Sequence, residues 1–237
     1  MTIPSGVTSI GNLAFSGCSG IGSVTVLADS VNVSSAFGDS RANITNLVIG
    51  ENVASIGYGA FSDCSGLTSV SIPFGVASIG YFAFSGCIGL TSVIIPPSVT
   101  NIASSAFSGC SGLTAVTIPP SVTSLGVNVF SGCSGVTSFS VDGSNPSYCS
   151  RAGMLCSKDG MVLLAGVNGD VAIPSGVTRV EKSAFSRYGG LTSVTIPQSV
   201  TNIGECAFRD CRALMSFSVA SDNPVYSAIN GLLCSKD

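Results

Sequence analysis

The chain repeats one pattern of apolar and polar residues every 23 positions. Within residues 113–130, Leu113, Val116 and Ile118 are apolar, and the polar Thr117 separates the last two. Alternation with a period of two predicts a short strand that is buried on one face. Two prolines follow this strand. Because proline lacks an amide donor and restricts the residue before it, the chain is expected to leave the strand ladder there and turn.

The second half of the unit returns to the interior. Val122 and Leu125 are apolar again, and the Val129-Phe130 pair that follows is expected to pack beneath the strand. Gly132 permits the next turn, since glycine adopts backbone angles that other residues avoid. Each unit is therefore predicted to be one coil, made of a strand and returning segments.

The markers of this unit recur along nearly the whole chain. The Ile-Pro dipeptides that end the predicted strands begin at Ile72, Ile95, Ile118, Ile173 and Ile196. The aromatic marker stands at Phe61, Phe84, Phe107, Phe130, Phe185 and Phe208, with Phe15 and Phe37 recognisable upstream. A fixed period of this length predicts a solenoid, so we expect one elongated domain over residues 1–237. Since both ends fall inside a repeat, we expect a segment of a longer array.

Two segments depart from the period. The stretch from Leu27 to Ser40 lacks the Ile-Pro and cysteine markers, which predicts a degenerate repeat. Between Phe130 and Phe185 the spacing is 55 residues, one period plus 32. We place the resulting insert at residues 142–173. Its sequence begins again near the end of the chain, which predicts the start of a second, truncated insert over residues 220–237.

The insert carries a hairpin signal. Ala152-Gly153 aligns with Asn230-Gly231 of the second copy, and Asn-Gly is a strong signal for a two-residue hairpin turn. We therefore predict a small antiparallel meander within the solenoid. The turn places Cys149 directly opposite Cys156, where either a disulfide or two free thiols fit the geometry. The second copy has serine in place of the first cysteine, so the fold does not need the bridge.

Three stretches carry the repeat in its clearest form: Gly-Leu-Thr-Ser-Val-Ser-Ile-Pro at 66–73, Ser-Val-Thr-Asn-Ile at 98–102 and Ala-Phe-Ser-Gly-Cys at 106–110. The pattern L-x-x-V-x-I, with one cysteine per unit, resembles a leucine-rich repeat, and its form resembles the BspA-like (Treponema-type) leucine-rich repeat family. The resemblance implies a strand-rich, right-handed and curved solenoid of the α/β type, with β-hairpin inserts and a parallel ladder on its concave side. It also implies a cell-surface or secreted location.

The charge of the chain excludes several kinds of partner. Only 9% of the residues are charged, the formal net charge is −3 and the pI is near 4.7. Nucleic-acid binding needs a basic stripe, whereas the nine Lys and Arg residues are scattered. Apolar runs such as Met161 to Ala165 are far shorter than the roughly 20 residues that span a bilayer. We therefore expect neither nucleic-acid binding nor membrane insertion.

Cysteine is the conspicuous reactive residue type. One cysteine recurs at the same position of most units, and we interpret these residues as buried thiols that pack as small apolar groups. Stacked coils lie close enough for disulfides, but parallel side chains rarely reach the required dihedral angle. Zinc is disfavoured because the chain has no histidine and no Cys-x-x-Cys pair. The predicted structural row consists of Cys18, Cys64, Cys87, Cys110, Cys133 and Cys211.

Catalysis finds little support in the sequence. The absence of histidine removes the commonest general base and every Ser-His or Cys-His arrangement. Paired carboxylates would be the alternative, but no two acids recur at an equivalent position in neighbouring repeats. The chain is therefore predicted not to be an enzyme, and we assign no catalytic residue, metal or cofactor.

The outward positions of the predicted strands form the remaining candidate surface. Leucine-rich repeats commonly bind through this face, although the same residues also suit a solvated strand through their β-propensity. Aromatic and Arg side chains, the usual binding hot spots, are missing there. Tyr148 and Tyr226 of the inserts are either alternative contacts or part of the hairpin core. The predicted binding row is Thr25, Val48, Ser71, Ile94, Thr117, Ser140, Thr195 and Ser218.

Two hypotheses for function follow. The first is a non-enzymatic module of a cell-surface or secreted repeat protein that binds a protein or glycan through many weak contacts along the ladder. The alternative is a structural spacer or scaffold, which includes end-to-end self-association favoured by the low charge. Neither hypothesis identifies the ligand.

Overall fold

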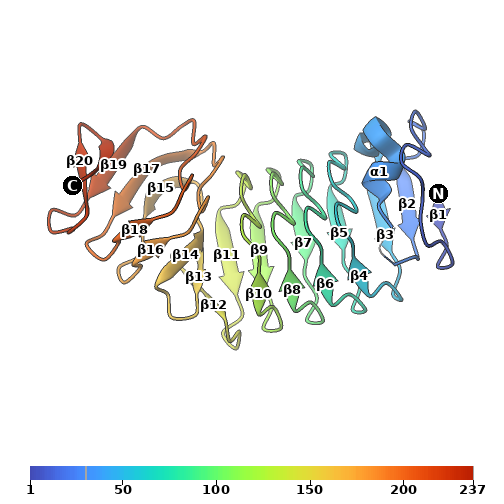
Figure 1. The fold of residues 1–237 in the computed structure, drawn as a ribbon, viewed down its shortest axis with the longest axis horizontal. Helices are drawn as coiled ribbons and strands as arrows, with labels where there is room; N and C mark the ends of the chain where they lie inside the picture. Colours follow the sequence, from blue (N-terminus) through green and yellow to red (C-terminus); the bar gives the residue numbers. More distant parts are fainter. Residues whose placement is uncertain (30, 237) are drawn as a thin grey trace.

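The chain forms an elongated solenoid of stacked coils, with its two ends at opposite tips (Figure 1). The structure is a computed structural model that describes residues 1–29 and 31–236, so Asp237, the last residue of the second predicted insert, lies outside it. Strands of successive coils pair 23 residues apart, as Ser69 with Ser92. The strand-rich solenoid predicted from the sequence period is thereby confirmed.

One side of the solenoid is a ladder of parallel strands, here called the ladder face. Side chains alternate between the core and solvent along each strand, as in the Ala115–Ile118 strand, where Val116 and Ile118 are buried. The ladder strands are β1 (Thr2–Ile3), β2 (Ser23–Val26), β3 (Asn46–Ile49), β5 (Ser69–Ser71), β7 (Ser92–Ile94), β9 (Ala115–Ile118), β11 (Ser138–Val141), β15 (Gly169–Ala172), β17 (Leu191–Ile196) and β19 (Ser216–Val219).

A second, narrower ladder follows the proline turns. Its strands have two residues each, and Val122, which leads into one of them, is buried as expected. Strands of this kind pair in parallel with their neighbours, for example Ser78 with Asn101. The second ladder consists of β4 (Ser55–Ile56), β6 (Ser78–Ile79), β8 (Asn101–Ile102), β10 (Ser124–Leu125), β16 (Arg179–Val180) and β18 (Asn202–Ile203).

The third side, here called the loop edge, is a row of tight turns, one for each regular coil. The turns bond to one another through their backbones: Phe107 N–H donates to the Val129 carbonyl at 3.0 Å, and Gly109 N–H donates to the Ser131 carbonyl at 2.7 Å. Gly109 has a φ of +76°, which glycine adopts without the strain that a side chain would cause. Each coil therefore depends on the next for its hydrogen bonds.

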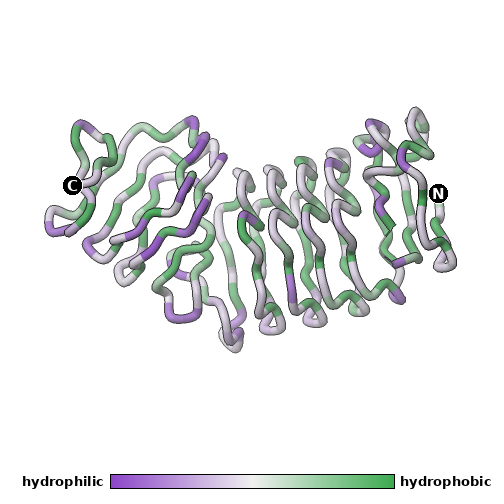
Figure 2. The backbone as a smooth tube through the Cα atoms, in the orientation of Figure 1, coloured by the Kyte–Doolittle hydropathy of each residue, from purple (hydrophilic) through white to green (hydrophobic). Residues whose placement is uncertain are grey.

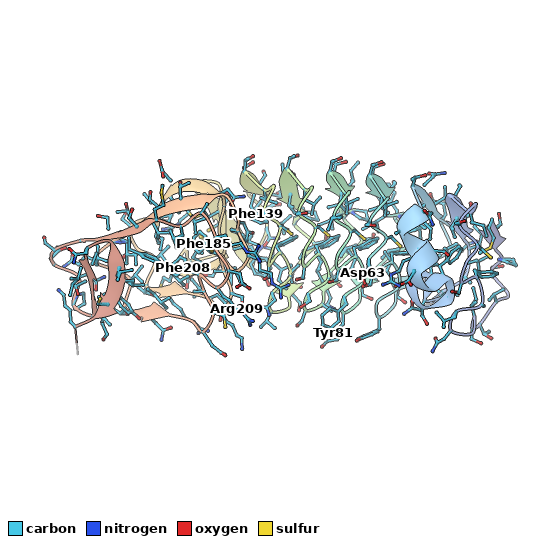
Figure 3. All side chains as sticks on the ribbon, turned by 90° about the horizontal axis from the view of Figure 1, so that it is seen from above. Asp63, Tyr81, Phe139, Phe185, Phe208 and Arg209 are labelled. Carbon is cyan, nitrogen blue, oxygen red and sulfur yellow. The ribbon has the colours of Figure 1, made fainter. Side chains whose placement is uncertain are left out.

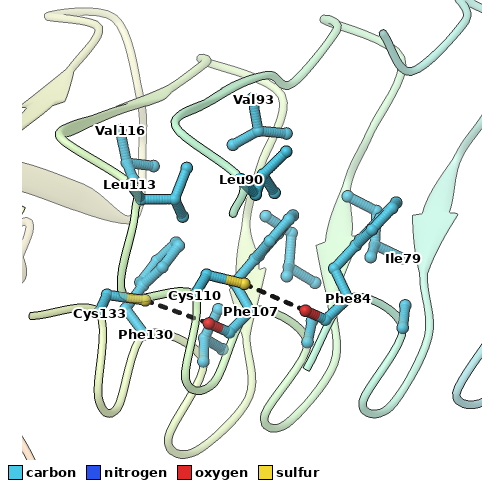
Figure 4. Close-up of a cluster of buried hydrophobic side chains, with 14 of the residues drawn as sticks. Ile79, Phe84, Leu90, Val93, Phe107, Cys110, Leu113, Val116, Phe130 and Cys133 are labelled. Atoms are coloured by element: carbon cyan, nitrogen blue, oxygen red, sulfur yellow. Dashed lines mark hydrogen bonds between the residues drawn. The ribbon is translucent and has the colours of Figure 1, made fainter. Parts of the chain in front are cut away.

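The core is a row of stacked aromatic rings between the ladders and the loop edge (Figure 4). The ring centroids of Phe84 and Phe107 lie 5.4 Å apart with an interplanar angle of 4°, and those of Phe107 and Phe130 lie 5.9 Å apart. Leu113 and Val116 cover the rings from the ladder side and are fully buried or nearly so. Since the rings of successive coils stack on one another, the hydrophobic core forms from contacts between neighbouring repeats and not within a single repeat.

The degenerate repeat contains the helices of the described chain. Helix α1 (Val33–Phe37) and the 3-10 helix η1 (Gly38–Asn43) replace the regular turn of the loop edge. Asn32 caps α1, because its side-chain oxygen accepts from the Ser35 N–H at 2.7 Å. Phe37 is fully buried, so the aromatic marker keeps its place even though the turn has changed.

The insert contains the expected antiparallel meander. Strands β12 (Tyr148–Arg151), β13 (Met154–Ser157) and β14 (Val162–Ala165) follow one another, and β20 (Tyr226–Ile229) pairs with β21 (Leu232–Ser235) in the second copy. However, β14 also pairs in parallel with β16, and β15 pairs in parallel with β17. The extra residues therefore make one enlarged coil of the solenoid, which contributes to both ladders, instead of a separate excursion from it.

The enlarged coil interrupts the ladder face. The hairpin turn occupies the edge of β11, where Phe139 N–H donates to the Gly153 carbonyl at 2.7 Å. Among residues 1–29 and 31–236, β11 and β15 belong to different sheets. The ladder strands on the C-terminal side run in a visibly different direction from those on the N-terminal side (Figure 1). We call this break between β11 and β15 the seam.

Candidate functional site

The predicted binding row lies on the ladder face. Its members pair across neighbouring strands, as Val48 does with Ser71 and Ser71 with Ile94. Thr25 is half-buried, and the other predicted members are exposed. The seam divides the row into two parts. The larger part holds Thr25, Val48, Ser71, Ile94, Thr117 and Ser140, and the smaller holds Thr195 and Ser218.

The larger part of the row is neutral, with two uncovered aliphatic side chains among hydroxyl groups. Val48 is 46% exposed and Ile94 is 71% exposed, on either side of Ser71. The smaller part lies beside a carboxylate: Asp170 of β15 accepts hydrogen bonds from the hydroxyls of Thr192 and Ser193, which lower its pKa. The two parts thus present different chemistry to a ligand.

Exposed aromatic side chains lie on the loop edge, apart from the predicted binding row. Tyr58, Tyr81 and Phe82, here called the aromatic patch, are 69%, 55% and 41% exposed. The rings of Tyr58 and Phe82 meet edge to face with centroids 5.8 Å apart. Figure 3 shows Tyr81 on the side away from the ladder strands. Tyr58 and Tyr81 stand one period apart, so the repeat alignment carried a signal for this patch.

Several strongly hydrophilic residues lie along the coils beyond the seam (Figure 2), and charged ones among them form ion pairs on the loop edge. Lys182 Nζ lies 2.6 Å from a Glu205 carboxylate oxygen, and this pairing raises the pKa of Lys182 and lowers the pKa of Glu205. Arg187 and Arg209 both lie within 4.0 Å of the Asp210 carboxylate, at 3.9 and 3.5 Å. All these groups are largely exposed, so the pairs contribute little to stability.

The cysteine row is a packing element that also forms hydrogen bonds. Each of three buried thiols donates to the carbonyl of the phenylalanine 26 positions earlier, at 3.1 Å (two are drawn in Figure 4). Burial raises the pKa of Cys64 and of Cys133 to about 12. Cys18 and Cys211 at the ends of the row are only half-buried. The interpretation as small apolar groups therefore missed the hydrogen bond.

Tyr188 holds the cysteine position in the coil after the seam. It stands 55 residues after Cys133, the spacing that also separates Phe130 from Phe185. Its hydroxyl donates to the Phe130 carbonyl at 3.2 Å, and the side chain is fully buried. Burial raises the pKa of Tyr188, so the phenol keeps its proton. The longer tyrosine side chain thus forms, across the enlarged coil, the same side-chain-to-phenylalanine-carbonyl hydrogen bond that the cysteines form in regular coils.

Removing this hydroxyl should weaken the junction between the two halves. Tyr188→Phe leaves the packing in place but removes one of the two hydrogen bonds to the Phe130 carbonyl, which keeps the Cys133 N–H at 3.1 Å. We expect the free energy of unfolding to fall by about 0.5–1.5 kcal/mol, the net contribution of one hydrogen bond. Urea unfolding at pH 7 measures the change. Tyr81→Phe, on the exposed loop edge, is the matched control and should stay within about 0.5 kcal/mol of the parent. Equal effects of the two changes would contradict the assigned role of Tyr188.

The two cysteines of the meander face each other as expected, since Cys149 pairs with Cys156 across the hairpin. Both are free thiols in this structure, and the Cys149 thiol donates to the Ser157 carbonyl at 3.0 Å. Tyr148 belongs to the fold of the hairpin: its hydroxyl accepts from the Leu125 N–H at 2.9 Å. Tyr226 bonds to Ile203 N–H in the same way at 3.1 Å.

Metal and membrane sites find no support in the described residues. Over residues 1–29 and 31–236, no group of three or more His, Cys, Asp or Glu side chains is placed to hold a metal ion. Neither of the helices described there is long and apolar enough to cross a membrane. The side chain of Asn145 holds the turn after β11: it donates to the Pro119 carbonyl at 2.8 Å and accepts from Tyr148 N–H at 2.8 Å.

Comparison with known proteins agrees with this architecture. The family model described as BspA type leucine rich repeat region matches six copies, over residues 1–37, 33–157 and 168–228. A comparison with curated protein sequences gave no match.

Several solved structures have the same fold. A leucine rich cell surface protein from Faecalibacterium prausnitzii A2-165 is 29% identical, with a TM-score of 0.66, over 91% of this chain and 68% of its own. The pneumococcal vaccine antigen PcpA is 23% identical, with a TM-score of 0.72, over 93% of this chain and 60% of its own. A leucine-rich repeat protein from Eubacterium ventriosum ATCC 27560 is 21% identical, with a TM-score of 0.54, over 76% of this chain and 61% of its own.

Proposed function

Because this chain belongs to the BspA-type leucine-rich repeat family, we propose that it is a non-enzymatic binding module of a cell-surface or secreted repeat protein. Its ligand, a protein or a glycan, would lie along the ladder face. The surface location draws support from the Faecalibacterium relative, which is called a cell surface protein. The chain spans about two thirds of that relative's length, so the proposal concerns the repeat module.

The observation that carries the proposal is the in-register row Val48, Ser71 and Ile94 on three neighbouring strands. Aliphatic side chains that stay this exposed on an ordered ladder are available to a partner and contribute little to the core. The surrounding face is polar but almost uncharged, and it offers shallow contacts. Affinity is therefore expected to come from many small contributions along the row.

Positive charges introduced on the ladder face should weaken ligand binding. In the triple variant Ser71→Lys, Ile94→Lys and Thr117→Lys, three cations would stand side by side on the face, and we expect at least tenfold weaker binding to whichever matrix glycoprotein or glycan the parent binds. Binding is measured on an array of immobilised glycoproteins and glycans. The control variant carries three lysines with the same spacing beside the second ladder, at the exposed positions Ala77, Thr100 and Thr123.

The outcomes separate the candidate surfaces. Loss in the ladder variant alone supports the proposal. Equal loss in both variants, or none in either, would argue against the ladder face, and a variant with Tyr58→Ser and Tyr81→Ser then tests the aromatic patch, whose ring types are common in binding hot spots. If nothing binds and the particle size rises with concentration, the spacer or self-associating hypothesis takes its place.

A further inference from the structure

The enlarged coil lacks the turn that each regular coil places on the loop edge. β14 passes through residues 166–168 directly into β15, so the turns at 126–131 and 181–186 face each other with no turn between them. They approach at Gly132, whose N–H donates to the Ser186 carbonyl at 2.8 Å. Beyond this contact they enclose a cavity of about 140 Å³, here called the seam pocket. Leu125, Phe130, Leu155 and Leu164 line it, together with the charged Glu181 and Lys182.

Two backbone donors beside this pocket have no acceptor. In the preceding coil, the Ser105 and Phe107 N–H groups donate to the Val127 and Val129 carbonyls of the next turn, both at 3.0 Å. Asn128 and Phe130 hold the equivalent positions one coil later and line the seam pocket. Neither N–H finds an acceptor among residues 1–29 and 31–236, because the enlarged coil supplies no turn there and the Ala184 carbonyl of the facing turn accepts from Gly166 N–H at 2.9 Å instead.

A third polar group points to the same place. The side-chain oxygen of Asn128 is buried and has no hydrogen-bond partner within the described chain. Buried polar groups are nearly always paired, and an unpaired one costs about 1–3 kcal/mol. Two donors and one acceptor are therefore grouped at the wall of a largely apolar pocket with two charged residues in its lining, which is the pattern of a ligand site.

We propose that the seam pocket binds an extended peptide segment of a partner protein. Two carbonyls of this segment, two residues apart, accept from Asn128 N–H and Phe130 N–H, as the carbonyls of Val127 and Val129 do in a regular coil. A peptide N–H of the segment donates to the Asn128 side chain. Addition of an extended segment to unpaired backbone groups is a recurring mode of peptide recognition.

The size of the pocket specifies the anchoring side chain. A cavity of roughly 150 Å³ lined by aliphatic and aromatic groups admits benzene, so the seam pocket of about 140 Å³ suits one phenyl-sized or leucine-sized side chain. The partner is a different protein, because the matching segments of a second copy are folded inward: Phe84 and Phe107 are fully buried. A more open groove continues from the pocket past Ser131 and Arg187 and gives the rest of the segment a path to solvent.

A capped hexapeptide, acetyl-Ser-Ser-Ala-Phe-Ser-Gly-amide, tests this proposal on the full chain. Its sequence is that of residues 104–109, a turn of the kind that the enlarged coil lacks. We expect amide hydrogen exchange at Asn128 and Phe130 to slow at least tenfold in its presence, while the already bonded amide of Phe107 stays unchanged. A peptide with serine in place of phenylalanine should bind at least tenfold more weakly. Unchanged exchange at both amides, or equal binding of the two peptides, would overturn the proposal.

Substitutions locate the site. Leu164→Trp fills the pocket and should abolish peptide binding, and its urea transition shows whether the fold is kept. Asn128→Gly removes the unpartnered oxygen and still accommodates the φ of +60°, so the chain stays folded while peptide binding weakens several-fold. Ser105→Gly, at the same position one coil earlier with a φ of +59°, is the matched control and should bind like the parent.

This site is separate from the ladder face. The triple lysine variant of the ladder should bind the hexapeptide as the parent does, and Leu164→Trp should leave ladder binding intact. Failure of one proposal is therefore distinguishable from failure of the other. If Leu164→Trp is folded and still binds the hexapeptide, the seam pocket is not the site.

Discussion

Raising the pH above 9 is expected to unfold the protein steeply, because four thiols of the cysteine row are buried with raised pKa values. Burial raises the pKa of Cys64 and Cys133 from the ordinary value of 9.0 to about 12. Burial also raises the pKa of Cys87 and of Cys110 well above the ordinary value, with a smaller contribution from neighbouring thiols. The folded chain thus holds protons that the unfolded chain releases.

The sign of the effect follows from these protons. Below pH 9 the thiols are protonated in both states, and their contribution to stability is fully present. Between pH 9 and about 12 the unfolded state binds fewer protons than the folded state, so the free energy of unfolding falls as pH rises. Each thiol contributes a slope of about 1.4 kcal/mol per pH unit, and the four together remove several kcal/mol per unit.

Urea unfolding between pH 8 and pH 11, with a reductant present, measures this slope. The double variant Cys64→Ala and Cys133→Ala should have a slope smaller by about two protons, or about 2.7 kcal/mol per pH unit, while tyrosine and lysine titrations are common to both proteins. The variant will be less stable at pH 8, because alanine leaves small cavities, but the slope is independent of that offset. An unchanged slope would mean that these thiols ionise in the folded protein.

Phe107→Ala is expected to lower the free energy of unfolding by about 3–5 kcal/mol, the usual cost of deleting a fully buried phenyl ring. Phe107 stacks on Phe84 at 5.4 Å and on Phe130 at 5.9 Å, so its loss opens a cavity across two coil interfaces. Stability in a repeat array depends on contacts between neighbouring units. The change should therefore also reduce the coupling between the coils on either side.

Hydrogen exchange resolves the two effects. In the parent, we expect slow exchange of core amides throughout the regular coils, whereas in Phe107→Ala the amides of β7 and β9 should exchange fastest and the transition should broaden. Phe74→Ala removes a ring that is 72% exposed and should stay within about 0.5 kcal/mol of the parent. A loss at Phe107 no larger than that at Phe74 would show that the aromatic row does not hold the coils together.

The periodic part of this fold was predictable from sequence, since each marker recurs in the same chemical place. The Ile-Pro dipeptides do end ladder strands, and Phe61 through Phe130 do form the row of buried rings. The hairpin turn at Ala152-Gly153 fixed the pairing of Cys149 with Cys156, because a two-residue turn leaves one register. Local pattern was sufficient in these cases.

The seam was not predictable in this way. The hairpin lies within the solenoid because of hydrogen bonds such as that from Phe139 N–H to the Gly153 carbonyl. Such bonds join segments that are separate in the sequence, and no short sequence motif predicts them. The aromatic patch and Tyr188 were not predictable from the repeat pattern, because they depart from it. Tyrosine occupies the position of Tyr58 and Tyr81 in only two coils, and Tyr188 replaces the cysteine that other coils have. Residues of this kind are not part of the shared pattern, yet they supply the chemistry that differs from coil to coil.

The seam also affects how the molecule responds to tension. When a solenoid is pulled along its axis, coils separate first where the fewest strand pairs join them. Over the described residues both ladders are interrupted at the seam, because β11 and β15 are in different sheets and so are β10 and β12. Between β7 and β9, by contrast, the pairing of β8 with β10 continues the second ladder. Under load the array would therefore separate at the seam across both ladders, and lengthen there before any regular coil unravels.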